Sequence, residues 1–430
     1  MNPPPTAKPS RWPFHVMAKP IGPICNLDCS YCFYLEKESL YPDAGGADGF
    51  RMNDEVLENY IRQYIEGQSK NAGEVNFAWQ GGEPTLMGLP FFERVVELQK
   101  KHGRADLKVT NGLQTNGTLL DEQWARFLKE HDFLVGISID GPEDIHDRHR
   151  YNKSGKGSIR QVMRGLELLK KHEVEFNTLT VVHHDNADDP KGIYDFLKGI
   201  GSRFLQFIPI VEHTQILAAK KKHQRPILPI LTDTGVRIGA RSLQPDQWGA
   251  FLNGVFDRWL ECDDVGITYV QLFDMILGIV LGHPATLCVH AETCGRSVAI
   301  EHNGDLYSCD HFVSDEYKLG NIADTPLAKM LDAPQQKEFG ADKRDTLPKY
   351  CRKCDYLKFC WGACPKDRII KTPDGEDGLA YLCGGYMTFY RHTLPVFEKM
   401  AFCLRHERPA CDYVHVRTTS PRHGGSGGSR

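Results

Sequence analysis

Residues 25 to 32 read Cys25-Asn26-Leu27-Asp28-Cys29-Ser30-Tyr31-Cys32, which places three cysteines at a C-x3-C-x2-C spacing after a short apolar segment. Three thiolates in one loop can ligate three irons of a four-iron cubane cluster and leave the fourth iron open. The alternative is a structural zinc site, which needs a fourth ligand, and only Asp28 inside the loop offers one. A catalytic zinc is less favoured, because three thiolates reduce the Lewis acidity of the metal. The loop therefore favours an iron–sulfur cluster with one open iron.

The composition is that of a soluble globular protein. The chain has 430 residues, 25% of them charged and 41% hydrophobic, and a formal net charge of -4. No global basic field indicates nucleic acid or an anionic membrane as a partner, and Lys220 to Lys222 is interpreted as a solvated loop. The segment Met1 to Pro13 carries five prolines and no apolar core, so we expect neither a signal peptide nor a membrane anchor. These features predict a cytoplasmic protein.

Cysteine usage points to metal ligation. Fourteen cysteines are present, and a reducing cytosol disfavours disulfides. Eleven of the cysteines fall into groups with ligand-like spacing. We expect Cys262, Cys403 and Cys411, which are left over, to be small buried or partly exposed thiols.

The first half of the chain alternates strand-like and helix-like segments. The strand candidates are residues 14–19, 75–79, 107–115, 133–139, 175–182 and 204–209, and the helix candidates between them are 53–66, 89–102, 121–130, 158–172 and 190–199. Such alternation predicts an α/β fold of parallel strands with right-handed crossovers, and six units predict a partial (β/α)6 TIM-like barrel. Glycine and polar residues follow the strands, where such barrels carry their sites.

Two of the predicted strands end in short segments that combine glycine, proline and a carboxylate. The second strand runs into Gln80-Gly81-Gly82-Glu83-Pro84, and the fourth into Ser138-Ile139-Asp140-Gly141-Pro142. Each is an ordinary turn if taken alone. Together with the cysteine loop and the Phe33-Tyr34 pair that follows it, they resemble the signature of the radical S-adenosylmethionine (SAM) superfamily. In that superfamily SAM chelates the open iron and is cleaved to a 5'-deoxyadenosyl radical, so the resemblance implies a radical SAM barrel with SAM as co-substrate.

The resemblance also implies which residues contact SAM. The backbone at Gly82 and Glu83 would bind its amino group, and glycine allows the main chain to approach a ligand closely. Arg150 would bind the carboxylate, for which its planar donor fork is suited. The remaining implied contacts are Ser138 to the ribose, and Tyr31 and Val211 to the adenosyl group. The plain alternatives are a capping serine, a surface arginine and a core valine.

The second half carries a second group of cysteines. Cys351, Cys354, Cys360 and Cys364 form a C-x2-C-x5-C-x3-C run, and with Cys288, Cys294, Cys309 and Cys383 they suffice for two four-thiolate sites. Two zinc ribbons are the alternative to two iron–sulfur clusters. The spacing resembles the SPASM domain of radical SAM peptide-modifying enzymes. That resemblance implies one auxiliary cluster on Cys288, Cys294, Cys309 and Cys364, and another on Cys351, Cys354, Cys360 and Cys383. Full ligation by protein suits electron transfer.

Residues 300–311 predict a hairpin with a turn at Asn303-Gly304, and this hairpin leads into Cys309. Asp310 follows that cysteine directly. A surface aspartate is the ordinary interpretation, but the position matches the general base of anaerobic sulfatase-maturating enzymes. We expect a desolvated site to raise the pKa of Asp310 toward the range useful for accepting a proton. His311 is a possible substitute base.

From about Phe14 to Cys403 the chain resembles these anaerobic sulfatase-maturating enzymes. The family oxidises one Cys or Ser in a sulfatase C/S-x-P-x-R motif to Cα-formylglycine without molecular oxygen. The resemblance therefore implies three [4Fe-4S] clusters, a sulfatase polypeptide as substrate, and an electron donor such as flavodoxin or ferredoxin. Asp310 would accept the proton of the target thiol or hydroxyl, and the auxiliary clusters would accept the surplus electron.

Two other functions fit parts of the sequence. One is a radical SAM maturase that crosslinks or otherwise modifies a ribosomal peptide, although the cysteine loop at residue 25 leaves no room for an amino-terminal leader-binding domain. The other is an electron carrier or zinc scaffold, which has no need of a SAM cavity. The expected domain order is a flexible segment 1–13, a barrel 14–240, a helical linker 241–286, a SPASM domain 287–390, a carboxy-terminal helix 391–417 and a flexible tail 418–430.

Overall fold

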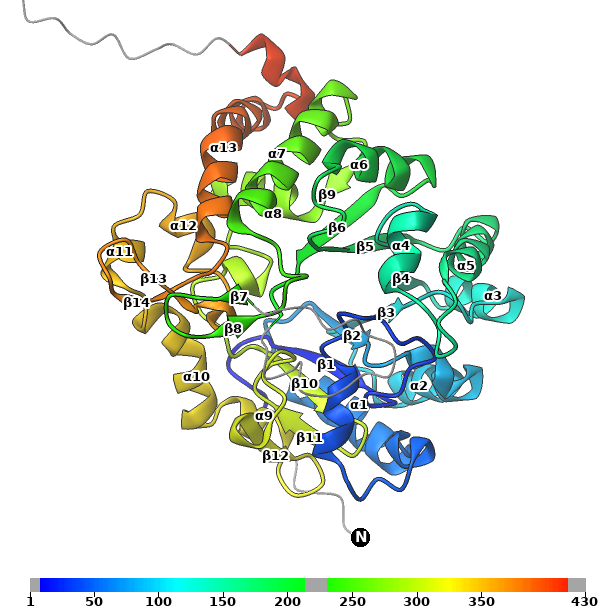
Figure 1. Ribbon diagram of the computed structural model, residues 1–430. Helices are drawn as coiled ribbons and strands as arrows, with labels where there is room; N and C mark the ends of the chain where they lie inside the picture. The colour runs from blue at the N-terminus through cyan, green and yellow to red at the C-terminus, as the bar shows by residue number, and fades with distance from the viewer. Residues whose placement is uncertain (1–7, 213–229, 417–430) are drawn as a thin grey trace, which may run out of the picture.

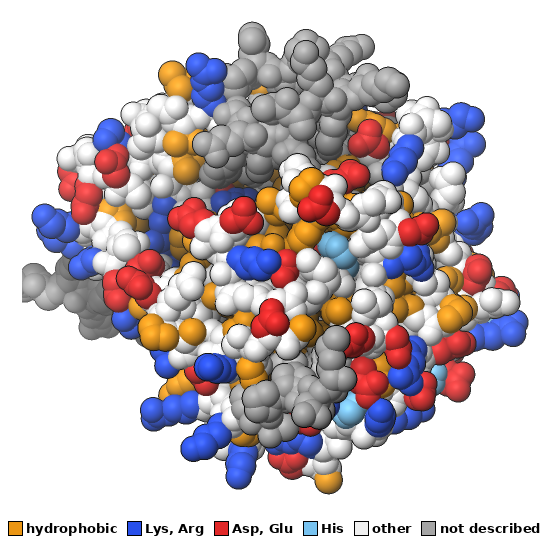
Figure 2. All heavy atoms as spheres, turned by 90° about the horizontal axis from the view of Figure 1, so that it is seen from below, with side chains coloured by type: hydrophobic (Ala, Val, Ile, Leu, Met, Phe, Trp, Pro, Cys, Tyr) orange, Lys and Arg blue, Asp and Glu red, His pale blue; other side chains and the backbone are white. Residues whose placement is uncertain are grey.

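The structure is a computed structural model that describes residues 8–212 and 230–416. The Lys220–Lys222 run and the tail 418–430 lie outside the described residues. No helix in the described part of the chain is long and apolar enough to cross a bilayer. On the face seen in Figure 2, Lys and Arg side chains are interspersed with Asp and Glu side chains.

The predicted barrel strands all form, and they pair in parallel in chain order. They are β1 (His15–Lys19), β2 (Glu74–Trp79), β3 (Lys108–Thr115), β4 (Phe133–Ser138), β5 (Phe176–Val182) and β6 (Phe204–Pro209). The predicted helices between them also form, as α1 (Asp54–Gly67), α2 (Leu89–His102), α3 (Glu122–Glu130), α5 (Ile159–Lys171) and α6 (Pro190–Gly199). Asn53 and Asp121 cap α1 and α3, where their side chains accept hydrogen bonds from the first turns. The fold class is confirmed.

Sequence patterns missed a short helix, α4 (Glu143–His149), which lies directly after the Ser138–Pro142 segment. They also missed that the sheet continues past the barrel on both sides (Figure 1). A two-residue strand, β9 (Tyr269–Val270), pairs with β6 from inside the expected helical linker, between α7 (Pro245–Glu261) and α8 (Gln271–Leu281).

The predicted Asn-Gly hairpin forms, and it joins the barrel sheet. β10 (Ser297–Glu301) and β11 (Asp305–Tyr307) are antiparallel around Gly304, whose φ is +87°, and β12 (Lys318–Asn321) follows. β10 pairs in parallel with β1 along its whole length, from His15 opposite Ser297 to Lys19 opposite Glu301. The cysteine-rich half is therefore continuous with the barrel through backbone hydrogen bonds.

Helices complete the cysteine-rich half. They are α9 (Leu327–Leu331), α10 (Pro334–Asp345), α11 (Lys349–Arg352), α12 (Leu357–Cys360) and α13 (Cys383–Arg405). Two strands between α12 and α13, β13 (Ile370–Lys371) and β14 (Asp377–Leu379), form a small antiparallel ribbon. A second small ribbon, of β7 (Ile230–Leu231) and β8 (Arg237–Ile238), lies before α7 in the chain. The helix expected from residue 391 begins earlier, at Cys383, because α13 packs against α7 and α8 from its first turns (Figure 1). Trp248 of α7 and Tyr386 of α13 meet edge to face at 6.1 Å.

Candidate active site

The cysteine loop lies at the carboxyl ends of the barrel strands, directly after β1. Backbone hydrogen bonds hold it to the segment after α4, with Asp28 N donating to Tyr151 O at 2.8 Å and Ser30 N to His149 O at 3.0 Å. Burial raises the pKa of Cys25, and the negative charges of Glu83, Cys29 and Cys32 raise it further. Thiolates that oppose one another's ionisation in this way need a bound cation to balance them, so the donor set fits a metal cluster.

The described residues bring one set of three metal-ligand atoms within 4.8 Å of one another, that of His149, His183 and Asp185, and no cysteine belongs to it. This group is poorly suited to a cation. His149 already uses both ring nitrogens, Nδ1 with Ser30 Oγ at 2.7 Å and Nε2 with Asp185 Oδ2 at 2.6 Å. Arg148 also lies 3.3 Å from Asp185 and supplies the positive charge that a metal ion would bring. The group therefore ties the cysteine loop to the segment after β5.

Gly82 and Glu83 pack against the chain that leads into the cysteine loop. Gly82 N donates to Gly22 O at 2.8 Å, and Glu83 N donates to Ile24 O at 2.9 Å. A Cβ at Gly82 would lie 1.9 Å from Ile24 O, so only glycine allows this approach. The Glu83 carboxylate is buried and accepts from Thr85, Thr115 Oγ1 at 2.7 Å and Asn116 N at 2.7 Å. The side chain of Glu83 thus joins the ends of β2 and β3.

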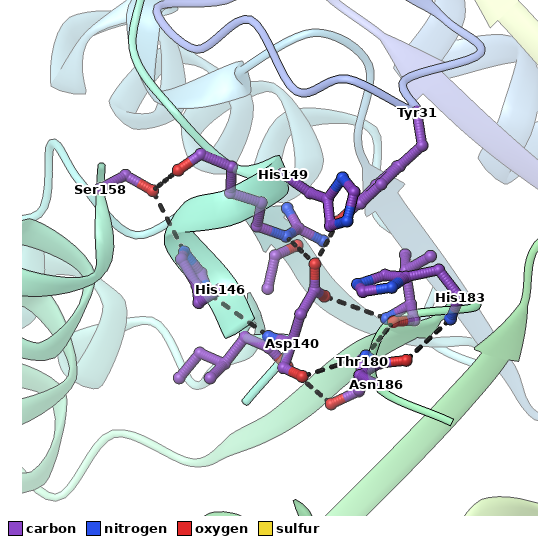
Figure 3. A network of polar contacts seen from close by, with 12 residues as sticks. Tyr31, Asp140, His146, His149, Ser158, Thr180, His183 and Asn186 are labelled. Atoms are coloured by element: carbon purple, nitrogen blue, oxygen red, sulfur yellow. Dashed lines mark hydrogen bonds and ion pairs between the residues drawn. The ribbon is translucent and has the colours of Figure 1, made fainter. Parts of the chain in front are cut away.

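Two of the expected SAM contacts, Tyr31 and Arg150, bond to a carboxylate that sequence analysis did not select (Figure 3). Asp140 is completely buried, its Oδ2 accepts from Arg150 Nε at 2.9 Å and from the Tyr31 hydroxyl, and its Oδ1 accepts from Val181 N at 3.1 Å. Burial raises the pKa of Asp140, but the positive charges of Arg150 and His146 outweigh burial and hold that pKa at about 2. Asp140 is therefore an ionised anchor that fixes Tyr31 and Arg150 together.

The other two expected SAM contacts lie near this network. Ser138 ends β4, and its Oγ accepts from Gln114 Nε2 of β3 at 3.1 Å. Val211 is buried just after β6. The signal for Asp140 was present in the Ser138–Pro142 segment, but a lone aspartate after a strand gives no indication of its partners.

Asp310 lies beside a buried lysine. Lys19 ends β1, and its Nζ is 2.6 Å from Asp310 Oδ1 and 4.7 Å from the centre of the Tyr34 ring. The Tyr34 hydroxyl donates to Glu301, which ends β10 opposite Lys19. Because the strand pairing of β1 and β10 brings these groups together, Lys19 and Glu301 could not be selected from the sequence. Lys19 thus holds Asp310 at the end of β1.

The expectation that the pKa of Asp310 is raised was wrong. Burial raises it, but the Lys19 ammonium and the adjacent His311 lower it by more, so the pKa lies below the ordinary value. Asp310 is therefore ionised at neutral pH. His311 points toward the thiols, with its Nδ1 3.7 Å from Cys364 Sγ, and burial lowers its pKa.

The other eight cysteines interact in two groups through their charges. Cys309 interacts with Cys364 and Cys288, and Cys294 also interacts with Cys288. Cys383 interacts with Cys360, Cys351 and Cys354. We call these the first thiol set (Cys288, Cys294, Cys309, Cys364) and the second thiol set (Cys351, Cys354, Cys360, Cys383). Burial is the main cause of the raised pKa in each of these thiols for which a shift is resolved, as at Cys364, where the pKa is about 12.

Comparison with known proteins assigns the chain to a family. Residues 20–197 match the radical SAM superfamily, and residues 288–355 match an iron–sulfur cluster-binding domain, SPASM. A serine-type anaerobic sulfatase-maturating enzyme of Bacteroides thetaiotaomicron is 43% identical over 395 residues, which cover 92% of this chain and 93% of that protein. The chain belongs to the anaerobic sulfatase-maturating enzymes.

Other members of this sulfatase-maturating family are also similar to the chain over most of its length. A cysteine-type enzyme of Clostridium perfringens is 36% identical, with 89% of this chain and 97% of that protein covered. A solved structure described as native anSMEcpe with bound AdoMet and Cp18Cys peptide has a TM-score of 0.75 and 35% identity, and covers 91% of this chain and 99% of that one. Streptococcus suis SuiB with its precursor peptide SuiA, at 14% identity and a TM-score of 0.58, shares the fold alone.

Proposed function

We propose that this protein oxidises one Cys or Ser side chain in a C/S-x-P-x-R motif of a sulfatase polypeptide to Cα-formylglycine, without molecular oxygen. Similarity to sulfatase-maturating enzymes over nine-tenths of the chain is the observation that carries the proposal. Relatives of the serine type and of the cysteine type are both similar, so we propose both residues as targets.

We assign the site residues to two proposed roles, binding of an iron–sulfur cluster and binding of SAM. Cys25, Cys29 and Cys32 would hold a [4Fe-4S] cluster, and the backbone at Gly82 and Glu83 with Tyr31, Ser138, Arg150 and Val211 would bind SAM. Once bound, the cluster and SAM would supply a 5'-deoxyadenosyl radical able to remove a hydrogen atom from the target Cβ. Asp140 keeps Tyr31 and Arg150 in place through the hydrogen bonds described above.

Asp310 is proposed to accept the proton of the target thiol or hydroxyl. It is ionised, and it lies beside Lys19 at the end of β1 and next to Cys309 of the first thiol set, so a substrate bound there would meet a carboxylate ready to take a proton. The first and second thiol sets would each hold a four-iron cluster, which serves to accept the surplus electron. Flavodoxin or ferredoxin is the proposed donor to the cluster at the cysteine loop, and the cytoplasm is the proposed location.

The test uses anaerobically reconstituted protein. Full loading gives about twelve irons per chain. With SAM, a reductant and an 18-residue peptide containing C-x-P-x-R or S-x-P-x-R, we expect 5'-deoxyadenosine and an aldehyde that hydrazine traps. A peptide in which the target residue is Ala is the matched control. Deoxyadenosine without aldehyde from either peptide, or a crosslinked product, would contradict the proposed function.

A further inference from the structure

Arg368 lies between the two thiol sets, since its guanidinium bonds to the Trp361–Gly362 turn that connects Cys360 of the second set to Cys364 of the first. Its positive charge interacts with Cys294 and Cys364 of the first set and with Cys351 and Cys360 of the second. No catalytic step proposed above uses this side chain. It comes shortly after Cys364, in the segment that leads to β13.

A strained turn holds the guanidinium. Arg368 Nε donates to Gly362 O at 2.9 Å, and its Nη2 donates to Trp361 O at 2.8 Å. Trp361 and Ala363 have φ of +46° and +52°, a left-handed conformation that non-glycine residues rarely adopt. Gly362, between them, also has positive φ, and a Cβ there would lie 2.9 Å from Arg368 Nη2. The turn is thus shaped around the arginine, and such strain persists where the surroundings enforce it.

Arg368 has no carboxylate partner among the residues that the structure describes. None of the ion pairs among residues 8–212 and 230–416 includes it, and its Nη1 is a buried donor without a hydrogen-bond partner. Arg368 is partly buried, and removing a cation from water is costly unless a negative charge or hydrogen bonds compensate for it. Four thiolates on a cubane give the whole site a net negative charge, so clusters on both thiol sets would supply the missing counter-charge.

We propose that Arg368 is a positioning residue that serves as the shared counter-cation of the two auxiliary clusters and raises the reduction potential of both. The proposal rests on the clusters of the proposed function, because it concerns the thiols that would ligate them. A positive charge beside a cluster stabilises its reduced form, so each cluster accepts an electron more readily. Since Arg368 faces both sets, it favours the reduced state of each.

The buried Lys343 differs from Arg368 in its partners. Its Nζ donates to the carbonyls of Cys288 at 2.6 Å and Val289 at 2.9 Å, and its charge interacts chiefly with Cys294, Cys288 and Cys364 of the first set. We therefore expect Lys343→Met to affect the first cluster more than the second, whereas a change at Arg368 affects both.

The test is a potentiometric titration of the reconstituted holoenzyme, followed by electron paramagnetic resonance. In Arg368→Gln we expect the midpoint potentials of both auxiliary clusters to become more negative, and in Arg368→Lys, which keeps the charge, we expect a smaller shift. Arg352→Gln is the matched control, because Arg352 also donates to two carbonyls, at 2.9 and 2.7 Å, but is exposed. A fully loaded Arg368→Gln enzyme with either auxiliary potential unchanged overturns the proposal.

A second measurement uses the wild-type protein, so it does not depend on the folding of a variant. Wild-type holoenzyme labelled with 15N-arginine should show a 15N hyperfine coupling on both reduced auxiliary clusters, and its absence from either cluster also overturns the proposal. The aldehyde assay distinguishes failure of this proposal from failure of the proposed function. Unchanged auxiliary midpoint potentials in an active, fully loaded Arg368→Gln enzyme count against the role of Arg368 alone. A wild-type chain that binds only about four irons counts against the auxiliary clusters of the proposed function.

Discussion

At the scale of single residues, the site depends on carboxylates whose partners fix their charge. Asp310 and Asp140 are both desolvated, and in both a neighbouring cation overcomes the effect of burial and lowers the pKa. Lys19 provides that cation for Asp310, and Arg150 provides it for Asp140. Each carboxylate is therefore ionised, as the proposed role of Asp310 as a base requires, and Asp140 holds two side chains in place.

Replacing Asp310 by Asn separates proton transfer from radical formation. Asparagine is similar in shape but cannot accept the proton, so we expect aldehyde formation to fall by about 10²- to 10⁴-fold while 5'-deoxyadenosine is still produced. Chromatography of both products from the same reaction provides the measurement. Asp315→Asn, at an exposed carboxylate of the same segment, is the control and should retain wild-type activity. Aldehyde yields within a few fold of the wild type would remove Asp310 from its role.

Asp140 makes the free energy of unfolding depend on pH, in a direction that its lowered pKa sets. Its pKa is about 2 in the folded protein, against about 3.9 unfolded. The stability it contributes is complete above the unfolded value and is lost as the pH falls through the folded value. We expect Asp140→Asn to lower the free energy of unfolding by about 2 kcal/mol at pH 7, and this difference to shrink between about pH 4 and pH 2.

Chemical denaturation at several pH values measures this difference. The control is Asp144→Asn, an exposed aspartate on α4, which should leave stability almost unchanged. A loss of stability that is the same at pH 3 as at pH 7 would mean that Asp140 is not ionised through its contact with Arg150.

At the scale of elements, the ends of neighbouring strands hold the cysteine loop in shape. The turn after β2 donates backbone hydrogen bonds to the segment that leads to Cys25, and the Glu83 side chain links this turn to the end of β3. The approach is possible because residue 82 has no side chain. The geometry of the first cluster site is therefore set by contacts between loops that lie far apart in the sequence.

Gly82→Ala tests that contact. The added methyl group would lie 1.9 Å from Ile24 O, so the segment before Cys25 must move. We expect iron to fall from about twelve toward about eight per chain, and 5'-deoxyadenosine by at least about tenfold, because only the first cluster site is disturbed. Gly73→Ala, where a Cβ meets nothing within 4 Å, is the matched glycine control. Normal iron and deoxyadenosine in Gly82→Ala would show that the close approach is not required.

At the scale of the whole molecule, the barrel and the cysteine-rich half form one folding unit. β10 pairs with β1 along the full strand, and α13 packs against α7 and α8. Phe256 of α7, Phe273 of α8 and Phe397 of α13 share ring contacts, at 5.1 Å between Phe256 and Phe397. Neither half buries these surfaces alone.

We therefore expect a fragment of residues 1–286 not to fold independently. Without β10 the backbone groups of β1 form an open edge, and without α13 the aromatic faces of α7 and α8 are exposed, which promotes aggregation. Gel filtration and circular dichroism of the fragment, with the full chain as control, provide the measurement. A soluble, cooperatively folded fragment that binds about four irons would contradict this expectation.

The sequence alone determined the fold class, the strands and helices of the barrel, the candidate cluster cysteines and the position of Asp310. These features are local, because strand and helix periods, capping residues and C-x-x-C spacings are each encoded within a few residues. The resemblance to known motifs then supplied the chemistry that the spacing implies.

Tertiary structure decided what lies beside those residues. The ion pair of Lys19 with Asp310, the contact of Asp140 with Tyr31 and Arg150, and the position of Arg368 between two thiol sets all join segments that meet only after folding. Charge interactions depend on distance and burial in space, and neither is determined by separation along the chain. For this reason the sequence offered Asp310 as the candidate base but predicted the wrong direction for its pKa.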